Sequence, residues 1–518
     1  MQHIPNLKIN YIVIYYLIFQ CIPLAIHSQN IEWQKCFGGS GNEIANCVIQ
    51  SRDGGFLIVG YTTSTDYDAQ NNHGANDGMV IKTDSLGNLI WSKCYGGSND
   101  DFISCVIETD DGNFILGGAS RSTDGDLTNN FGASDAWILK ISDQGAILWQ
   151  KTYGGTQDEL ITQIQTDANG NLYLLANSYS NDLDVHGQHG DRDIWIVKID
   201  SIGGLIQEKC IGGSASDLAF SMTTATNGNL LIYGTTGSTD GNVSGNHGDY
   251  DTWFIDVDTN LNLINQKCYG GRFEDYGYSI IQKDSNKIEL VGYSLSDDGD
   301  IYGVPDTLFG NYFNIEIDIF SNIYRSITYG GSYPDEARSV VISTDGNIII
   351  TGSSASTDGQ VTGNHGDGDF WVLESDSNGI LLWENCFGGF GAEYPYDSKL
   401  TRDNGLIMVG HAGDNSGDVS GFHGGFTDFW VVKLGIFSTN INSIKKNNLK
   451  IYPNPTVNEV NIKGCSEGDL IEVFDFMGNL IFEKYALQIE DQINLDSLPM
   501  GIYILFVGNY DSFKIIKN

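Results

Sequence analysis

Basic side chains are scarce in this 518-residue sequence, which has 27 Lys and Arg against 66 Asp and Glu and a formal net charge of −39. A surface of that charge repels nucleic-acid phosphates and anionic bilayers, so neither partner is expected. Beyond residue 29 no run of 18 apolar residues is present, and no transmembrane segment is predicted in the mature chain. Residues 31–435 also lack apolar positions at the 3.6-residue period of a helix. Because 41% of the residues are hydrophobic, the chain can still bury a core, and these features favour an all-β fold.

The first 29 residues have the pattern of an export signal. One cation, Lys8, precedes an apolar run at 11–26, and a short polar stretch follows at 27–29. This order is typical of a secretory signal peptide that is cleaved near Ser28 or Gln29.

An internal repeat organises the chain from there to residue 435. An aromatic residue followed by two glycines marks six copies, and Ile211 replaces the aromatic residue in one more. The first glycines of the seven copies are Gly38, Gly96, Gly154, Gly212, Gly270, Gly330 and Gly388. The spacing is 58 residues except for one step of 60, so insertions are nearly absent.

Each copy is predicted to contain four short strands. In the first copy these are 45–50, 56–62, 78–83 and 89–93, and the Asp53-Gly54 pair between the first two predicts a tight hairpin. Four strands in a repeat of this length are typical of one blade of a propeller.

The two ends of the repeat array predict how it closes. The last copy stops after its third strand, at 429–434, whereas a strand of the missing type stands at 31–36. There Trp33 occupies the position of Trp91 and Trp149. Pairing of the N-terminal strand with the last copy would leave no free edge. A seven-bladed β-propeller over residues 30–435, closed by the N-terminal strand, is therefore predicted.

The last 70 residues leave the repeat period. After a linker at 436–448, short strands split by turns at 449–518 predict a small β-sandwich of immunoglobulin-like type. The residues that mark its motifs are Tyr452, Pro453, Asn454, Pro455, Gly478 and Gly501.

Both parts of the chain resemble known families. The Asp-x-Trp-Val/Ile-x-Lys strand, the Tyr-Gly-Gly element and the Ser-Thr-Asp-Gly loop resemble secreted bacterial β-propeller repeats of the SBBP-like group. The motifs of 449–518 resemble the type A C-terminal sorting domain of the type IX secretion system. This second resemblance implies that the type IX machinery handles the chain through these residues. It places the protein outside the cell or on the outer surface of a Gram-negative bacterium, and an unrelated accessory domain is the alternative.

Two columns of polar side chains recur among the copies. An acidic residue follows the second glycine by four positions in every copy, at Glu43, Asp101, Glu159, Asp217, Asp275, Asp335 and Glu393. Catalysis needs one or two distinct groups, so a structural bond to the backbone is favoured over a ring of carboxylates that attracts a cation. The other column is His73, Phe131, His189, His247, Phe309, His365 and His423. Because phenylalanine cannot ligate a metal or move a proton, a packed ring is predicted there. No nucleophile and base recur together, and no catalytic residue is predicted.

The loop between the second and third strands carries oxygen side chains at the spacing of a calcium loop. Asp240, Asn242 and Asp251 fall at positions 1, 3 and 12 of a twelve-residue span. The calcium candidates are Asp124, Asp126, Asp135, Asp240, Asn242, Asp251, Asp358 and Asp369. Local hydrogen bonding by Asp, Asn and Gly explains the same residues as turns without a metal, so both interpretations stand. No other cofactor is predicted.

Two local disulfides are conceivable for an exported chain. Cys36 and Cys94 each have a second cysteine eleven residues on, at Cys47 and Cys105. They require that the strands of each pair approach within about 7 Å between Cα atoms.

Near-identical copies without an asymmetric catalytic group favour a binding or adhesion module for a glycan or a protein. The alternative is an extracellular polysaccharide hydrolase or lyase, with carboxylates from the divergent fifth copy at Asp298, Asp300 and Asp306. A third possibility is a structural surface protein whose acidic loops maintain solubility.

Overall fold

The computed structural model describes residues 30–301, 309–435, 450–463, 470–475, 480–486, 490–507 and 513–517. The chain divides into two compact units, 1–437 and 438–518, which are described separately. The predicted signal peptide and linker lie outside the described residues. Every regular element in the described ranges is a β-strand, and none of them contains a helix that could cross a membrane. The all-β prediction is confirmed.

The first unit contains seven four-stranded antiparallel sheets, each built from four strands in a fixed spatial order. The first strands are β2 (Glu43–Gln50), β6 (Asp101–Glu108), β10 (Glu159–Thr166), β14 (Asp217–Thr224), β18 (Asp275–Gln282), β22 (Asp335–Ile342) and β26 (Tyr394–Leu400). The second strands are β3 (Phe56–Thr62), β7 (Phe114–Ser120), β11 (Leu172–Ser178), β15 (Leu230–Thr236), β19 (Lys287–Ser294), β23 (Ile348–Ser354) and β27 (Leu406–Ala412). The third strands are β4 (Asp77–Thr83), β8 (Asp135–Ile141), β12 (Asp193–Ile199), β16 (Asp251–Val257), β20 (Asn311–Asp318), β24 (Asp369–Ser375) and β28 (Asp428–Leu434). The fourth strands are β5 (Leu89–Tyr95), β9 (Ile147–Tyr153), β13 (Leu205–Ile211), β17 (Leu263–Tyr269), β21 (Ile323–Tyr329), β25 (Leu381–Phe387) and β1 (Ile31–Phe37).

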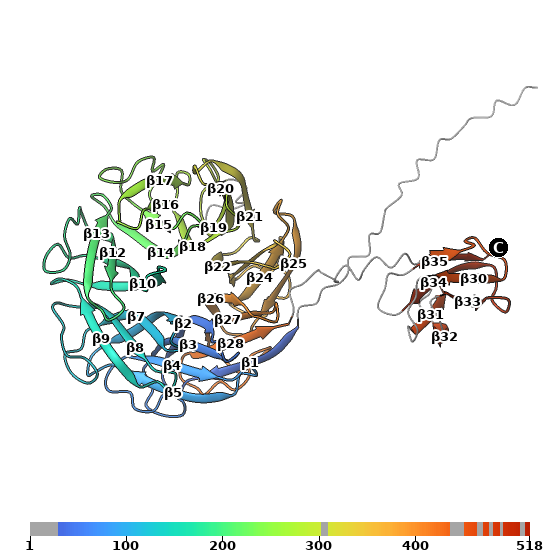
Figure 1. The fold of residues 1–518 in the computed structure, drawn as a ribbon, viewed down its shortest axis with the longest axis horizontal. Helices are drawn as coiled ribbons and strands as arrows, with labels where there is room; N and C mark the ends of the chain where they lie inside the picture. The colour runs from blue at the N-terminus through green and yellow to red at the C-terminus, as the bar shows by residue number, and fades with distance from the viewer. Residues whose placement is uncertain are drawn as a thin grey trace, which may run out of the picture. The chain divides into compact units, whose positions relative to one another are not determined.

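The N-terminal strand completes the last sheet. β1 pairs antiparallel with β28, from Ile31 opposite Leu434 to Phe37 opposite Phe429, as the sequence predicted. First strands of consecutive sheets contact each other, and β2 also contacts β26 of the last sheet. Figure 1 shows the sheets set around a common centre with their first strands nearest to it.

A glycine in the second strand allows the first two strands of a sheet to approach closely. The register between β2 and β3 shifts between Ala45 and Cys47, which forms a bulge. Gly60 faces this bulge, and a Cβ there would collide with the carbonyl oxygen of Ile44. The same arrangement recurs in six of the sheets, which explains why glycine repeats at this position although its φ is ordinary.

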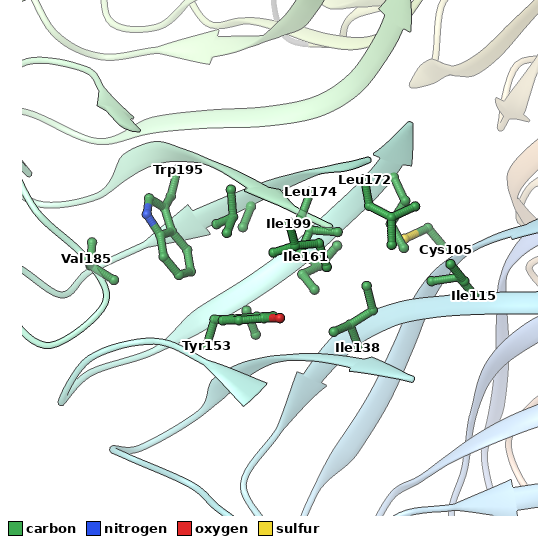
Figure 2. Packing of buried hydrophobic residues seen from close by; sticks show 14 of the residues in the cluster. Cys105, Ile115, Ile138, Tyr153, Ile161, Leu172, Leu174, Val185, Trp195 and Ile199 are labelled. Atoms are coloured by element: carbon green, nitrogen blue, oxygen red, sulfur yellow. The ribbon is translucent and has the colours of Figure 1, made fainter. Parts of the chain in front are cut away.

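Apolar side chains fill the space between consecutive sheets. In one such cluster Trp195 of β12 is fully buried and packs with Ile161 and Tyr153, which come from β10 and β9 (Figure 2). The Tyr153 hydroxyl donates a hydrogen bond of 2.6 Å to the carbonyl oxygen of Gly203. Third-strand tryptophans of five copies are buried in this way, at Trp137, Trp195, Trp253, Trp371 and Trp430.

The two local disulfides that the sequence left open are not formed. Cys36, Cys47, Cys94 and Cys105 are all free thiols. Cys36 lies on β1 at the outer edge of one sheet, whereas Cys47 lies on β2, the first strand of the next sheet. The repeat thus separates cysteines that are only eleven residues apart.

The second unit has two sheets that share one core. One sheet contains β29 (Lys450–Tyr452), β30 (Glu459–Lys463) and β33 (Glu490–Asn494). The other contains β32 (Leu480–Tyr485), β31 (Leu470–Asp475), β34 (Gly501–Val507) and β35 (Phe513–Lys517). Val460 and Ile462 from the first sheet pack with Val473, Leu505 and Ile515 from the second.

Candidate functional site

A cavity of about 340 Å³ lies where the first strands converge, and we call it the central pocket. Its lining is Asn46, Tyr61, Phe102, Ser104, Leu160, Thr162, Phe220, Tyr278, Arg338 and Tyr396. Alternation along a strand explains this position. In β10, for example, Glu159 and Ile161 are buried whereas Leu160 and Thr162 are at least partly exposed.

One side of the central pocket is aromatic and carries a cation. The guanidinium of Arg338 lies 4.0 Å from the ring centre of Tyr278 and 5.9 Å from that of Tyr396. The Tyr278 ring is 5.2 Å from Phe220 and stacks on Tyr276 at 6.4 Å. Such contacts between rings and a guanidinium hold the side chains in fixed orientations.

Glu336 orients this cluster from beside the pocket. Arg338 Nη2 lies 2.6 Å from Glu336 Oε1, and the Tyr278 hydroxyl donates to the same oxygen at 2.8 Å. Burial raises the pKa of Tyr278, so this hydroxyl is a donor at neutral pH. The charge of Arg338 is therefore balanced locally, while its planar face lies on the rings.

On the opposite side of the central pocket the fourth residue of the first strand is small and polar, and Tyr61, Phe102 and Leu160 of the same sheets line the pocket beside it. Asn46, Ser104 and Thr162 occupy the same strand position as Phe220, Tyr278 and Arg338 in the other sheets. The Asn46 amide donates to the carbonyl oxygen of Ile103 at 2.8 Å. The central pocket therefore combines apolar ring faces with polar groups that can bind hydroxyls.

Sequence reasoning missed these residues because they differ from copy to copy. The repeat comparison selects positions that stay the same, and lining positions change from Asn46 to Phe220 to Arg338. The usable signal was the alternation of the first strand, in which the second and fourth residues point away from the buried carboxylate.

The recurring acidic residue of the first strand is structural, as the sequence favoured. Each of these seven carboxylates accepts the N–H of the second glycine, four residues earlier, at 2.7–2.9 Å. All seven are buried. In the first copy Thr62 and Ser64 also donate to Glu43, each at 2.7 Å. These carboxylates fix the chain where it passes from one sheet to the next, a junction we call the seam.

A second buried carboxylate faces the first across each seam but one. Its members are Asp77, Asp135, Asp193, Asp251, Asp369 and Asp428, and Asn311 takes the place in the remaining seam. A Cβ on Gly38 would lie 2.5 Å from Oε2 of Glu43 and 3.1 Å from Oδ1 of Asp428, so both oxygens face this glycine. In all seven copies the Oδ1 atom of this second side chain is buried without a hydrogen-bond partner among the described residues.

The histidine column binds these second carboxylates. In the five copies that have histidine, its Nδ1 lies 2.6–2.7 Å from the aspartate Oδ2. The prediction of a packed ring is therefore incomplete, because in these five copies the imidazole also forms a hydrogen bond with a buried carboxylate. Phe131 retains the backbone part of this contact, with its N–H donating to Asp135 Oδ2 at 2.6 Å.

Asp135 shows what the missing imidazole changes. Burial raises its pKa to about 7, and the nearby charges of Glu159 and Asp184 add to the increase. The fifth copy also has phenylalanine, Phe309, in place of histidine. There the second carboxylate is replaced by Asn311, whose amide carries no charge to bury.

The predicted calcium ligands are divided between two seams. Asp124, Asp240 and Asp358 each accept a backbone N–H close to the second glycine, at 2.7–2.8 Å. Asp126 and Asn242 approach the first glycine of the same copy, at 3.2 Å from its nitrogen. The twelfth-position residues Asp135, Asp251 and Asp369 instead lie at the following seam, as described above. The described residues contain no group of three or more His, Cys, Asp or Glu that could hold a metal. Calcium binding remains a prediction.

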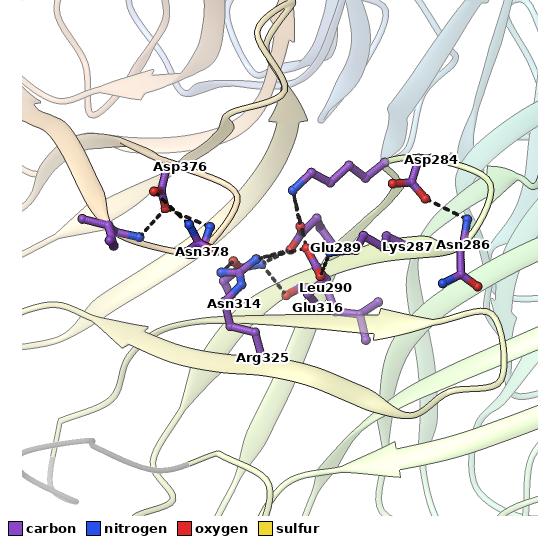
Figure 3. Close-up of polar contacts among 12 residues, drawn as sticks. Asp284, Asn286, Lys287, Glu289, Leu290, Asn314, Glu316, Arg325, Asp376 and Asn378 are labelled. Carbon is purple, nitrogen blue, oxygen red and sulfur yellow. Dashed lines mark hydrogen bonds and ion pairs between the residues drawn. The ribbon is translucent and has the colours of Figure 1, made fainter.

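The divergent fifth copy contains a buried ion network rather than a cleft. Arg325 Nη2 lies 2.9 Å from Glu289 Oε2, and Arg325 Nη1 donates to Asn314 at 2.7 Å (Figure 3). In the same network, Lys287 Nζ lies 2.5 Å from Glu316 Oε1. Burial raises the pKa of Glu289. Of the acids proposed for catalysis here, Asp298 accepts the N–H of Arg272 at 2.9 Å, and Asp306 lies outside the described residues.

The motif of the second unit ties its first strand to its last. Asn454 accepts the N–H of Ile516 at 2.9 Å, and the N–H of Thr456 donates to the carbonyl oxygen of Ile516 at 2.8 Å. Tyr452, Pro453 and Pro455 flank these contacts, Gly501 begins β34, and Gly478 lies outside the described residues. Lys517 donates to the carbonyl oxygens of Leu495 and Leu498.

Comparison with known proteins identifies the second unit. Residues 450–518 match the family described as the secretion system C-terminal sorting domain. This agrees with the predicted type IX sorting domain, and the protein is therefore a secreted or cell-surface protein that the type IX system exports. No match was found among curated proteins.

Solved structures resemble the chain only distantly. PorZ of Porphyromonas gingivalis, described as an essential surface component of the type IX secretion system, is 13% identical with a TM-score of 0.43. The match covers 93% of this chain but only 60% of PorZ. A Bacteroides caccae protein of unknown function is 11% identical with a TM-score of 0.36, over 63% of this chain and 93% of that protein. The Neurospora crassa Pan2 WD40 domain is 9% identical with a TM-score of 0.41, over 75% and 89%. Likenesses this distant carry no functional argument.

Proposed function

We propose that residues 30–435 form a closed seven-bladed β-propeller at the cell surface, and that its central pocket binds a glycan. The propeller is supported by seven like sheets, by contacts between consecutive first strands, and by the pairing of β1 with β28. The accompanying domain assignment is a signal peptide at 1–29, a linker at 436–448 and a sorting β-sandwich of immunoglobulin-like type at 449–518.

The observation that carries the glycan proposal is the Arg338–Tyr278 cluster beside a polar wall. Sugar rings have apolar faces that stack on aromatic rings, and hydroxyls that need planar or hydroxyl partners. The central pocket supplies the rings of Phe220, Tyr278 and Tyr396 on one side and Asn46 and Thr162 on the other. Its volume of about 340 Å³ is that of a small-molecule site, whereas a protein interface needs a much larger surface.

Binding is favoured over hydrolysis at this position. Glycoside hydrolysis needs two carboxyl groups about 5–9.5 Å apart on either side of the bond that breaks. The described lining of the central pocket includes no Asp or Glu. A hydrolase or lyase acting elsewhere on the chain remains the alternative function.

A glycan array with the full-length mature protein tests the proposal, followed by calorimetry on the best ligand. Tyr278→Ala should weaken binding at least tenfold, because it removes the ring on which Arg338 and the ligand stack. Phe320→Ala is the matched control, since this aromatic side chain is 73% exposed in the turn between β20 and β21. Equal losses in both variants, or no binding by the unmodified protein, would contradict the proposal. Release of shorter products from a bound polysaccharide would favour the enzyme.

A further inference from the structure

A second and larger cavity adjoins the central pocket. It has a volume of about 590 Å³, and Phe102 and Leu160 line both cavities. We call it the side pocket; it lies over the second and third sheets. A ligand that fills the central pocket can therefore continue past these two side chains into the side pocket.

Two arginines that the repeat does not require line the side pocket. Arg121 follows β7, and the equivalent residues in the other copies are Thr63, Tyr179, Gly237, Leu295, Ala355 and Gly413. Arg192 precedes β12, and its equivalents are Asn76, Ser134, Tyr250, Gly310, Gly368 and Thr427. No equivalent is basic, so neither arginine is needed to build a copy.

The guanidinium of Arg192 is held in place but incompletely bonded. It lies 4.1 Å from the ring centre of Tyr179, and its Nε has no hydrogen-bond partner among the described residues. To the described residues, the guanidinium of Arg121 makes only a long contact of 3.5 Å from Nη2 to Asp158 Oδ1. Because Nε of Arg192 is buried, the donors left for a ligand are the terminal nitrogens of the two guanidinium groups.

The charge of the side pocket favours a neutral ligand. Asp158, Glu159 and Asp191 line it together with the two arginines, so positive and negative groups are mixed. Both Glu159 oxygens accept hydrogen bonds, one from Gly155 and one from Ser178, which leaves Asp158 and Asp191 beside the arginines. A mature chain with a charge near −39 also repels polyanions from a distance. Mixed charged groups that present planar donors and acceptors suit the hydroxyls of an uncharged sugar.

We propose that the two pockets bind successive units of one linear, neutral oligosaccharide. The inference rests on the proposed glycan binding and adds the class and the extent of the ligand. One unit stacks in the central pocket, and the chain passes Phe102 and Leu160 so that later units meet Tyr179, Arg121 and Arg192. Both cavities have volumes in the range of about 300–1,000 Å³ that is usual for ligand sites.

Calorimetry with a length series tests this directly. The probes are gluco-, manno- and xylo-oligosaccharides from one to six units, with oligogalacturonate as the acidic counterpart, on the full-length mature protein. Affinity should rise at least tenfold from the monosaccharide to the hexasaccharide of the preferred series. Oligogalacturonate of equal length should bind more weakly.

Arg192→Ala should reduce hexasaccharide affinity about tenfold and leave monosaccharide affinity unchanged. Tyr179→Ala should likewise reduce hexasaccharide affinity and leave monosaccharide affinity unchanged. Agreement of the two variants would show that the loss does not come from a distortion caused by one substitution. Arg52→Ala is the control, since Arg52 contacts Glu108 and Asp110 away from both pockets. Equal affinity for all lengths, preference for the acidic series, or normal hexasaccharide binding by both variants overturns the inference but leaves glycan binding intact. Absence of binding to every saccharide overturns both proposals.

Discussion

The first strands of the sheets carry two kinds of position that behave in opposite ways. Seam positions, such as Glu159 in β10 and Asp275 in β18, have the same chemistry in every copy and are buried. Pocket positions on the same strands, such as Thr162 and Tyr278, change from copy to copy and line a cavity. The repeat preserves what each sheet needs in order to join the next, whereas the positions that line the central pocket vary from copy to copy. In a repeat protein, the irregular columns are therefore the better guide to function.

The largest expected effect comes from the buried third-strand tryptophan that packs between consecutive sheets. Trp195→Ala should lower the free energy of unfolding by about 3–5 kcal/mol, because the lost ring leaves a cavity between two sheets. Chemical unfolding followed by tryptophan fluorescence and circular dichroism measures the change. Thr162→Ala at a pocket position should change stability by less than about 1 kcal/mol. Equal losses of unfolding free energy in the two variants would contradict the difference between buried repeat positions and pocket positions.

The fifth copy gives a second test, because a charged network there replaces an apolar one. Arg325→Ala should lower stability by about 3 kcal/mol, since the buried Glu289 would lose its shortest ion pair and keep only the 3.3 Å contact with Lys283. Restoring the residues of the first copy, with Glu289→Leu and Arg325→Trp together, should return stability to at least the original level. A double variant less stable than Arg325→Ala alone would show that this copy needs its charges.

A smaller effect is expected from pH, and its sign follows from the seam carboxylates. Burial raises the pKa of Asp135 and Glu393 to about 7, and that of Asp275 to about 6. The folded state then binds more protons than the unfolded chain between pH 4 and 7, so stability falls as the pH rises through this window. Thermal unfolding at pH 5, 6, 7 and 8 measures this trend.

Asp135→Asn should remove part of that dependence. The variant copies the amide that Asn311 supplies in the fifth copy, and it should gain on the order of 1 kcal/mol at pH 8, about the value of one pKa unit. At pH 4, close to the usual pKa of an unfolded aspartate, the carboxyl is protonated in the folded chain and partly protonated in the unfolded chain, so the variant should nearly match the original protein. Asp111→Asn is the control, because hydrogen bonding to Lys140 lowers the pKa of Asp111. This substitution should therefore lower stability at pH 8 and not raise it. A variant that is less stable at pH 8 would contradict the assignment.

The smallest effect is expected from calcium. Because Asp124, Asp240 and Asp358 already bind backbone N–H groups, EDTA should move the thermal midpoint by only a degree or two relative to millimolar calcium. A shift of many degrees would establish the loops as metal sites.

The sequence predicted the elements of the fold well because each copy repeats the same local signals. Residues 56–62 were placed correctly as a strand, and Trp33 placed the N-terminal strand in the last sheet. The central pocket could not be predicted in this way, because its ten side chains come from seven different sheets. Seven of them occupy one column of the repeat, but they share no residue type. The histidine contacts were also missed. Because Phe131 and Phe309 occupy two places in the column, the sequence predicted packing of the rings and not a hydrogen bond from histidine to aspartate.

The pairing of β1 with β28 also has a consequence for how the chain folds. Each of the other sheets forms from neighbours within about sixty residues, whereas β1 must find a strand that begins almost four hundred residues later. Contacts between such distant residues form slowly, because closing a long loop loses entropy before any contact is gained. Six sheets can therefore fold early and in any order, while the last step waits for both ends of the unit to be available. Until β1 joins, β28 has an unpaired edge, and this edge is where a nascent or partly exported chain is most exposed to self-association.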